Sequence, residues 1–149
     1  MVLPLLDRSQ PSVLAEADVA LRRIGGVPTC LLTDDEKTVT VENVAGISVR
    51  HPGAVGFGRH YGLTIATCLP ADPQTKGGSE ATVRIAKANL VPTAANLLAQ
   101  YASFADLEEA CRTFCGQVNG RPHRVTRRVP AERLAEERSR LRPVPAPRQ

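Results

Sequence analysis

The sequence predicts an α/β fold, in which short apolar strands alternate with amphipathic helices. Two observations carry this prediction. Apolar runs of strand length occur at residues 2–6, 30–32 and 63–69, and stretches with the 3.6-residue period of a helix follow them. Hydrophobic residues make up 42% of the 149 residues, which is enough to close one core, so a disordered chain is not expected.

The first 35 residues are expected to form a strand, a helix and a second strand. Residues 2–6 have the continuous apolar character of a strand that is buried on both faces. Pro11 suits the first turn of a helix, and an apolar stripe runs on to Ile24 before Gly25 and Gly26 end it. The strand at 30–32 follows. A strand–helix–strand order indicates neighbouring parallel strands.

Residues 36–62 give a less uniform pattern. Alternation of Thr and Val at 38–41 favours extended chain, whereas residues 44–49 fit a strand or a helix equally well. Residues 52–62 fit a helix, although Gly53, Gly56 and Gly58 would each cost about 1 kcal/mol inside one. A further strand is expected at 63–69, where Pro70 ends it.

The second half of the chain is predicted to be helical. A Gly-rich turn at 76–78 leads into a helix over 79–90 that is mainly buried. Another amphipathic helix carries its apolar stripe on Phe104, Leu107, Cys111, Phe114 and Val118. Residues 131–141 are expected to form an arginine-rich helix, and the Pro-rich end is expected to be disordered.

The basic charge is concentrated near the end of the chain. The net charge is +4, and nine Arg stand against three Glu from Arg121 onward, which suits a polyanionic partner. Aromatic residues are only 3% of the chain, which argues against binding single strands by base stacking. The apolar residues at 2–6 are too few for a signal peptide or a membrane span, so we expect a cytoplasmic protein.

Several chemically reactive residues are expected to have structural roles. Cys111 and Cys115 lie four apart on an apolar stripe, which favours a core position over a metal site. His51 and His60 have no catalytic partner nearby in the sequence, so surface or packing roles are expected. Asp7 is interpreted as an acid that leads into the first helix.

Two acids are the candidates for chemistry. Asp34 follows the strand at 30–32, at the carboxyl end where α/β folds place their sites. Glu80 lies in the first turn of the helix at 79–90, on a stripe with Lys76, Arg84 and Lys87. If that helix packs beside the sheet edge, the two carboxylates converge on a hard divalent cation. The alternative is a solvated face with a Glu80–Arg84 ion pair.

Three segments resemble a known family. Residues 32–35 (LTDD) resemble the T-D-N strand end of the retroviral-integrase superfamily, and residues 73–80 (PQTKGGSE) resemble its P-x-S-K-G-x-x-E signature. Residues 119–123 (NGRPH) resemble the N-x-R-x-H stretch that follows the core in many insertion-sequence transposases. The likeness spans residues 2–145 and is nearest to the large transposases that work with an ATPase helper.

The resemblance implies a partial RNase H-like fold, with an integrase-type core over 1–120 and an arginine-rich segment over 121–149. In this family three acids hold two Mg²⁺ or Mn²⁺ ions. Asp34 and Glu80 match the second and third acids. No residue matches the first, which belongs further upstream, so we expect a truncated core that is inactive alone.

The implied partners are DNA, a full-length transposase, a helper ATPase and further copies of the chain, with a place at the nucleoid. DNA contacts are expected at seven basic residues: Lys76, Arg84, Lys87, Arg121, Arg124, Arg127 and Arg128. The alternative function is a non-catalytic remnant that binds DNA or takes part in assembly.

Overall fold

A computed structural model of the chain describes residues 1–33, 40–44, 47–67, 73–96 and 98–146. Side chains at 40–44, 47–48 and 73–80 are not described. The chain divides into two compact units, which are described separately. The helical unit comprises Met1–Pro4 and Pro73–Arg133, and the α/β unit comprises Leu5–Asp72 and Leu134–Gln149.

The α/β unit begins with helix α1 (Gln10–Ile24), as the sequence predicts. The Ser9 side chain caps the helix by accepting a hydrogen bond from the Ser12 N–H, and a proline occupies the first turn. Gly25 ends the helix with φ of 87°, a left-handed conformation that favours glycine. Local sequence signals therefore fix both ends of α1.

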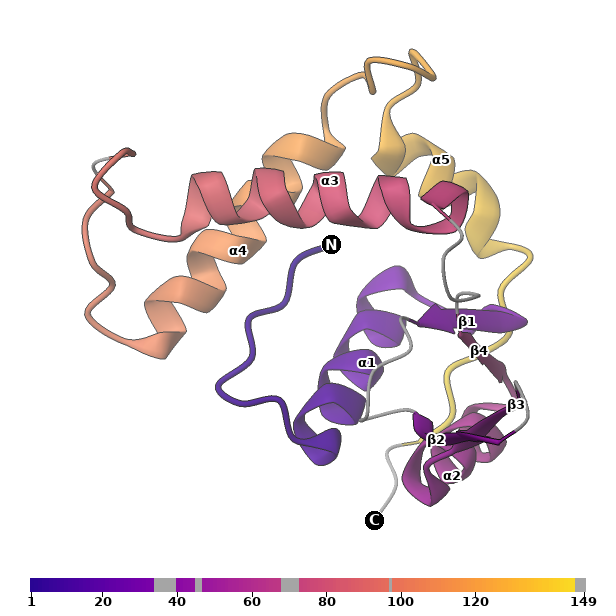
Figure 1. The fold of residues 1–149 in the computed structure, drawn as a ribbon. Helices are drawn as coiled ribbons and strands as arrows, with labels where there is room; N and C mark the ends of the chain where they lie inside the picture. The colour runs from indigo at the N-terminus through magenta and orange to yellow at the C-terminus, as the bar shows by residue number, and fades with distance from the viewer. Residues whose placement is uncertain (34–39, 45–46, 68–72, 97, 147–149) are drawn as a thin grey trace. The chain divides into compact units, whose positions relative to one another are not determined.

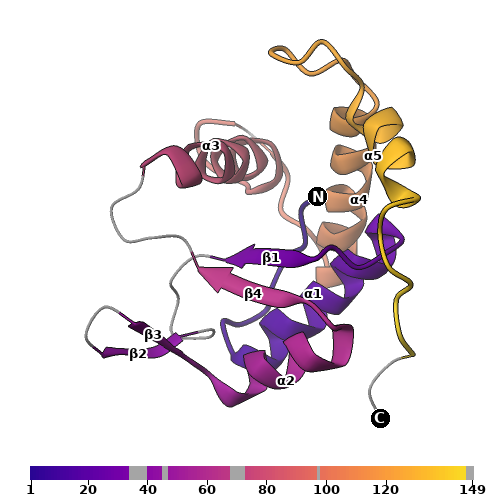
Figure 2. The ribbon, with the colours of Figure 1, turned by 90° about the vertical axis from the view of Figure 1, so that its right-hand side faces the viewer.

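Two parallel strands, β1 (Cys30–Thr33) and β4 (Thr64–Thr67), form the first sheet (Figures 1 and 2). Cys30 pairs with Thr64 at one end and Thr33 with Thr67 at the other. Leu31 and Ile65 pack towards the core of the unit. The parallel pair is consistent with the predicted α/β class, while the RNase H-like architecture stays a prediction.

Between β1 and β4 the chain forms a hairpin and a helix. Strands β2 (Thr40–Val44) and β3 (Ile47–Arg50) pair antiparallel, so the helical interpretation of 44–49 is wrong. Helix α2 (Pro52–Tyr61) forms despite its three glycines. Its N-terminus is capped by His51, whose Nδ1 accepts a hydrogen bond from the Gly53 N–H at 3.1 Å. His51 thus caps a helix, a role that differs from the surface or packing role expected of it.

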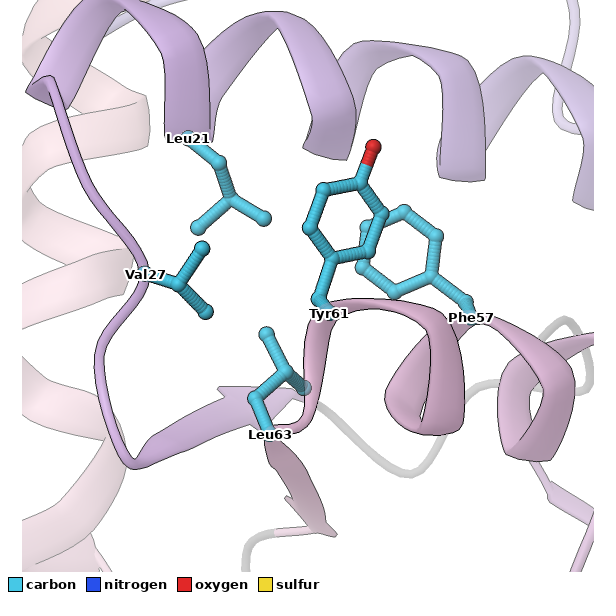
Figure 3. Close-up of a cluster of buried hydrophobic side chains, with 5 residues drawn as sticks. All are labelled: Leu21, Val27, Phe57, Tyr61 and Leu63. Atoms are coloured by element: carbon cyan, nitrogen blue, oxygen red, sulfur yellow. The ribbon is translucent and has the colours of Figure 1, made fainter. Parts of the chain in front are cut away.

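The core of the α/β unit is small and joins α1, α2 and the parallel strands. Figure 3 shows its five buried side chains: Leu21, Val27, Phe57, Tyr61 and Leu63. The Phe57 and Tyr61 rings lie 4.4 Å apart between their centroids. The Tyr61 hydroxyl points towards α1 and donates a hydrogen bond to Asp18. His60 packs edge-on against the Tyr61 ring, which confirms a packing role.

The prediction of a strand at residues 2–6 is wrong. These residues form no strand, and Leu6 is 80% exposed instead of buried. No strand in the described ranges pairs with them, and Pro4 has no N–H to give to a ladder. Val2 instead packs on the core of the helical unit, where its N–H contacts Cys115 Sγ at 3.0 Å.

The helical unit contains α3 (Pro73–Leu90), α4 (Phe104–Asn119) and the start of α5 (Pro130–Arg138). Its core is Ala86, Leu90 and Cys111, so the core position expected of Cys111 is confirmed. Leu107 and Phe114 pack against this core, as their stripe predicts, whereas Val118 is 45% exposed.

Two predictions for α3 are wrong. Residues 76–78 lie inside the helix rather than in a turn before it, because Pro73, which is preorganised for a first helical position, starts the helix earlier. The described side chains of the helix, at 81–90, are not mainly buried either. Val83 and Ile85 are both about half exposed, since one side of α3 packs against α4 within the unit.

The Pro-rich end, expected to be disordered, makes specific contacts as far as Ala146, and 147–149 lie outside the described residues. Arg142 forms an antiparallel bridge with Val27, and Val144 packs against the core of the α/β unit. Proline has little conformational freedom to lose on ordering, so a Pro-rich segment is held by few contacts. We call residues 139–146 the C-terminal strap.

Candidate functional site

Asp34 lies outside the described residues, but the strand that leads to it is described. Thr33, the residue before Asp34, ends β1 beside Thr67 of β4. The Thr33 hydroxyl donates a hydrogen bond to the Ala66 carbonyl oxygen at 3.3 Å, which ties the two strand ends together. The chain therefore enters Asp34 from the carboxyl edge of a parallel pair, where α/β folds bind ligands.

Glu80 and Lys76 lie on α3, in the part of the helix where the structure describes the backbone but not the side chains. Because α3 is a continuous helix, the predicted stripe keeps its register: Lys76, Glu80, Arg84 and Lys87 share one face. Arg84 and Lys87 are exposed, as a role in phosphate contact requires. The alternative, a Glu80–Arg84 ion pair, lies outside the described residues because the Glu80 side chain is not described.

The two candidate acids fall in different units, Asp34 in the α/β unit and Glu80 in the helical unit. Among the side chains that the structure describes, no three His, Cys, Asp or Glu gather into a metal site. Neither candidate carboxylate is part of that set. A pair of carboxylates is a suitable donor set for Mg²⁺ or Mn²⁺, which prefer oxygen ligands.

Asp7 serves the start of α1, as predicted. Its Oδ1 accepts a hydrogen bond from the Ser9 N–H at 2.8 Å. Hydrogen bonds from Ser9 and Ser12 hold the pKa of the Asp7 carboxyl below its ordinary value. A carboxylate that orders the residues before a helix in this way has a structural role.

The remaining four predicted DNA contacts lie together between α4 and α5. We call residues 121–128 the basic turn; it contains Arg121, Arg124, Arg127 and Arg128 and no acidic residue. All four arginines are exposed. Within the described part of the chain, none of their guanidinium groups makes a hydrogen bond or an ion pair. The structure therefore brings these four predicted residues into one segment.

The basic turn is bounded by residues that end helices. The Gly120 N–H donates to the Gly116 carbonyl oxygen at 3.0 Å and completes α4, and Pro122 follows two residues later. Pro130 begins α5. The arginines were predictable from the sequence but the turn was not, although Pro122 inside it and Pro130 just after it are signals of a turn.

Other arginines are used inside the fold. Arg22 bonds to Asp18 at 2.9 Å, and Arg112 bonds to Glu109 at 2.8 Å. Arg138 donates to the Ile24 carbonyl oxygen at 3.0 Å, at the end of α1. Arg142 donates to the carbonyl oxygens of Gly62 and Pro28. The basic excess of the tail is thus divided between structural contacts and the basic turn.

Two known proteins have sequences similar to this chain. No family profile matches it. It is 26% identical, over 144 residues, to the transposase for insertion sequence element IS232 of Bacillus thuringiensis subsp. berliner. The chain is similar to insertion-sequence transposases. It is also 30% identical, over 127 residues, to a provisionally assigned transposase for insertion sequence element IS5376 of Geobacillus stearothermophilus.

The two alignments cover 94% and 85% of this chain but only 32% and 30% of the relatives. The chain therefore spans about a third of the length of the transposases it matches. In the described ranges, no helix has the length and apolar character needed to cross a membrane.

Proposed function

We propose that this chain is part of a transposase catalytic core that cuts and joins DNA with the help of divalent metal ions. The observation that carries the proposal is the parallel pair β1–β4, whose carboxyl edge leads directly into Asp34. The similarity to insertion-sequence transposases over nearly the whole chain supports it.

In this proposal Asp34 and Glu80 hold Mg²⁺ or Mn²⁺ through their carboxylate oxygens. Bound metal supplies activation of the attacking hydroxyl and stabilisation of the leaving oxygen. Lys76, Arg84 and Lys87 lie on the same face of α3 as Glu80 and hold the DNA backbone beside it. The exposure of Arg84 and Lys87 supports this assignment.

The proposed core has an RNase H-like fold with a third acid. Within residues 1–149, only Asp34 and Glu80 match the metal-binding acids of the family. The remaining carboxylate must come from outside them, so residues 1–149 alone are expected to cut no DNA. The proposed partners are transposon ends, target DNA, further copies of the transposase and a helper ATPase, all at the nucleoid.

A second candidate function is DNA binding without catalysis, as a remnant that interferes with an intact transposase. The exposed basic turn favours it, because four arginines without acidic neighbours bind phosphates whether or not metal chemistry occurs.

A chimera tests the proposal. The stretch of the Bacillus thuringiensis transposase that matches this chain is replaced by residues 1–149, and transposition of a marked element is counted in a bacterial host. We expect transposition, with a loss of at least about a hundredfold in Asp34→Asn and in Glu80→Gln, since each removes a metal ligand.

Glu137→Gln is the matched control, because Glu137 is an exposed carboxylate on α5 and should leave transposition unchanged. Activity that survives both Asp34→Asn and Glu80→Gln would refute the assignment of the acids. An inactive chimera that folds and binds DNA would replace the catalytic proposal with the second candidate.

A further inference from the structure

The basic turn is held in one conformation by its own backbone. The His123 N–H donates to the Arg128 carbonyl oxygen and the Arg127 N–H to the His123 carbonyl oxygen, both at 2.8 Å. The His123 side chain adds a third contact, because its Nδ1 accepts from the Thr126 N–H at 3.4 Å. A turn that is ordered before binding loses little conformational freedom on contact with a partner.

The closed turn carries an apolar residue at its middle. Val125 lies at the centre of the segment that the Arg127–His123 bond closes, and it is 76% exposed. Arg124 precedes it and Arg127 and Arg128 follow it. Both ribbon views show the turn reaching beyond the end of α4 (Figures 1 and 2). A short apolar tip is thus flanked by cations on both sides.

The backbone at Arg127 points to a use for its side chain. Arg127 has φ of 56°, and it is the one residue other than glycine with positive φ in the described ranges. Side chains other than those of Gly, Asn and Asp rarely adopt this conformation, and glycine would adopt it without strain. A strained non-glycine residue at an exposed turn is a reason to look for function there.

We infer that the basic turn enters the minor groove of duplex DNA, with Val125 against the sugar and base edges and the flanking arginines on the two phosphate backbones. The minor groove is about 6 Å wide, which matches a single narrow turn rather than a helix. Its negative potential attracts arginine, and proteins that bind there often insert an apolar side chain. A single strand is a poorer partner, because residues 121–128 contain no aromatic side chain for stacking.

This inference rests on the DNA-binding part of the proposed function and not on metal chemistry. Its test uses residues 1–149 and a fluorescent duplex rich in A·T pairs, with binding followed by anisotropy at several salt concentrations. Arg127→Gly should weaken duplex binding by about fivefold or more. It should also lower the salt slope, the steepness with which the logarithm of the binding constant falls against the logarithm of the salt concentration, by about one. The melting temperature of the protein should stay the same or rise. Arg127→Lys should keep most of the binding.

Arg140→Gly is the matched control, since Arg140 is an exposed arginine outside the basic turn. Its salt slope should equal that of the wild type. Val125→Thr keeps the shape of the side chain and replaces one methyl group with a hydroxyl. It should weaken duplex binding about threefold and leave the salt slope unchanged. Binding that is indifferent to Arg127→Gly and to Val125→Thr would overturn the inference.

Two further binding measurements identify which DNA groove is occupied and whether duplex DNA is the partner. A drug that fills the minor groove should displace the protein, whereas methylation of guanine N7, which lies in the major groove, should have no effect. The opposite pattern would overturn the minor-groove assignment, and so would equal affinity for an acidic peptide or a single strand. An inactive chimera with intact duplex binding removes the catalytic proposal and leaves this inference standing.

Discussion

Val27 and Arg142 exchange two backbone hydrogen bonds: the Val27 N–H donates at 2.8 Å and the Arg142 N–H at 3.1 Å. Val27 is 1% exposed, and Val144, two residues after Arg142, packs on the same core. The C-terminal strap is therefore part of the α/β unit rather than an appendage. The Arg142 guanidinium is likewise used inside this unit, where it donates to two backbone carbonyl oxygens.

Removal of the Arg142 side chain should destabilise the α/β unit. Its guanidinium donates to the Gly62 carbonyl oxygen at 2.5 Å and to the Pro28 carbonyl oxygen at 3.0 Å. We expect Arg142→Ala to lower the free energy of unfolding by about 1–2 kcal/mol. Urea unfolding followed by circular dichroism measures this. Arg140→Ala is the control and should change the free energy by less than about 0.5 kcal/mol.

Gly26 is predicted to tolerate no side chain. A Cβ added there would lie 2.4 Å from the Cβ of Leu141, so the strap would have to shift. Gly26→Ala should therefore cost about 1–3 kcal/mol. Gly116, on α4, has open space around its added Cβ, and Gly116→Ala should stabilise by about 0.5–1 kcal/mol because alanine favours a helix. Equal effects of the two substitutions in thermal melts would contradict the packing of the strap.

Asp18 should contribute to stability in a pH-dependent way. A hydrogen bond from Arg22, with a further one from Tyr61, holds the pKa of the Asp18 carboxyl below its ordinary value. The folded state binds this proton more weakly than the unfolded chain. The contribution is therefore present above about pH 4 and is lost as the pH falls through the lower folded value.

Asp18→Asn should accordingly be less stable than the wild type near neutral pH, and the difference should shrink below about pH 4. Urea titrations at a series of pH values measure it. Glu16→Gln, on the same helix, removes an equal charge and is the control. A difference between wild type and Asp18→Asn that is constant with pH would contradict the Arg22–Asp18–Tyr61 contacts.

The polar stripe of α3 should bind DNA phosphates. We expect Arg84→Ala and Lys87→Ala each to weaken duplex binding and to reduce the salt slope by about one, without a preference for sequence. Electrophoretic shift at several salt concentrations measures both effects. Thr113→Ala, at an exposed position on α4, should change neither quantity.

The helices and strands that carry local sequence signals, such as capping residues or apolar runs, were predicted from the sequence. Ser9, Pro11 and Gly25 define α1, and the apolar runs at 30–32 and 63–69 predicted β1 and β4. Elements that depend on distant partners were less predictable. Residues 2–6 have the composition of a strand, but a strand forms only with a hydrogen-bonding neighbour, and the described part of the chain offers them none.

The candidate site was predictable in part for similar reasons. Spacing on a helix placed Glu80, Arg84 and Lys87 on one face, and α3 keeps that register. The closed conformation of the basic turn depends on backbone hydrogen bonds around His123, which composition does not reveal. The division of the tail arginines between carbonyl contacts and solvent likewise follows from tertiary packing.

Asp34 and Glu80 are proposed to hold a metal ion together. Iron-directed cleavage tests it most directly: Fe²⁺ replaces Mg²⁺ in the chimeric transposase, and ascorbate with peroxide cuts the backbone near the bound metal. We predict cuts next to residue 34 and next to residue 80, both lost on excess Mg²⁺ and both lost in Asp34→Asn. Cuts at one of the two positions alone, or cuts that persist in Asp34→Asn, would contradict the account.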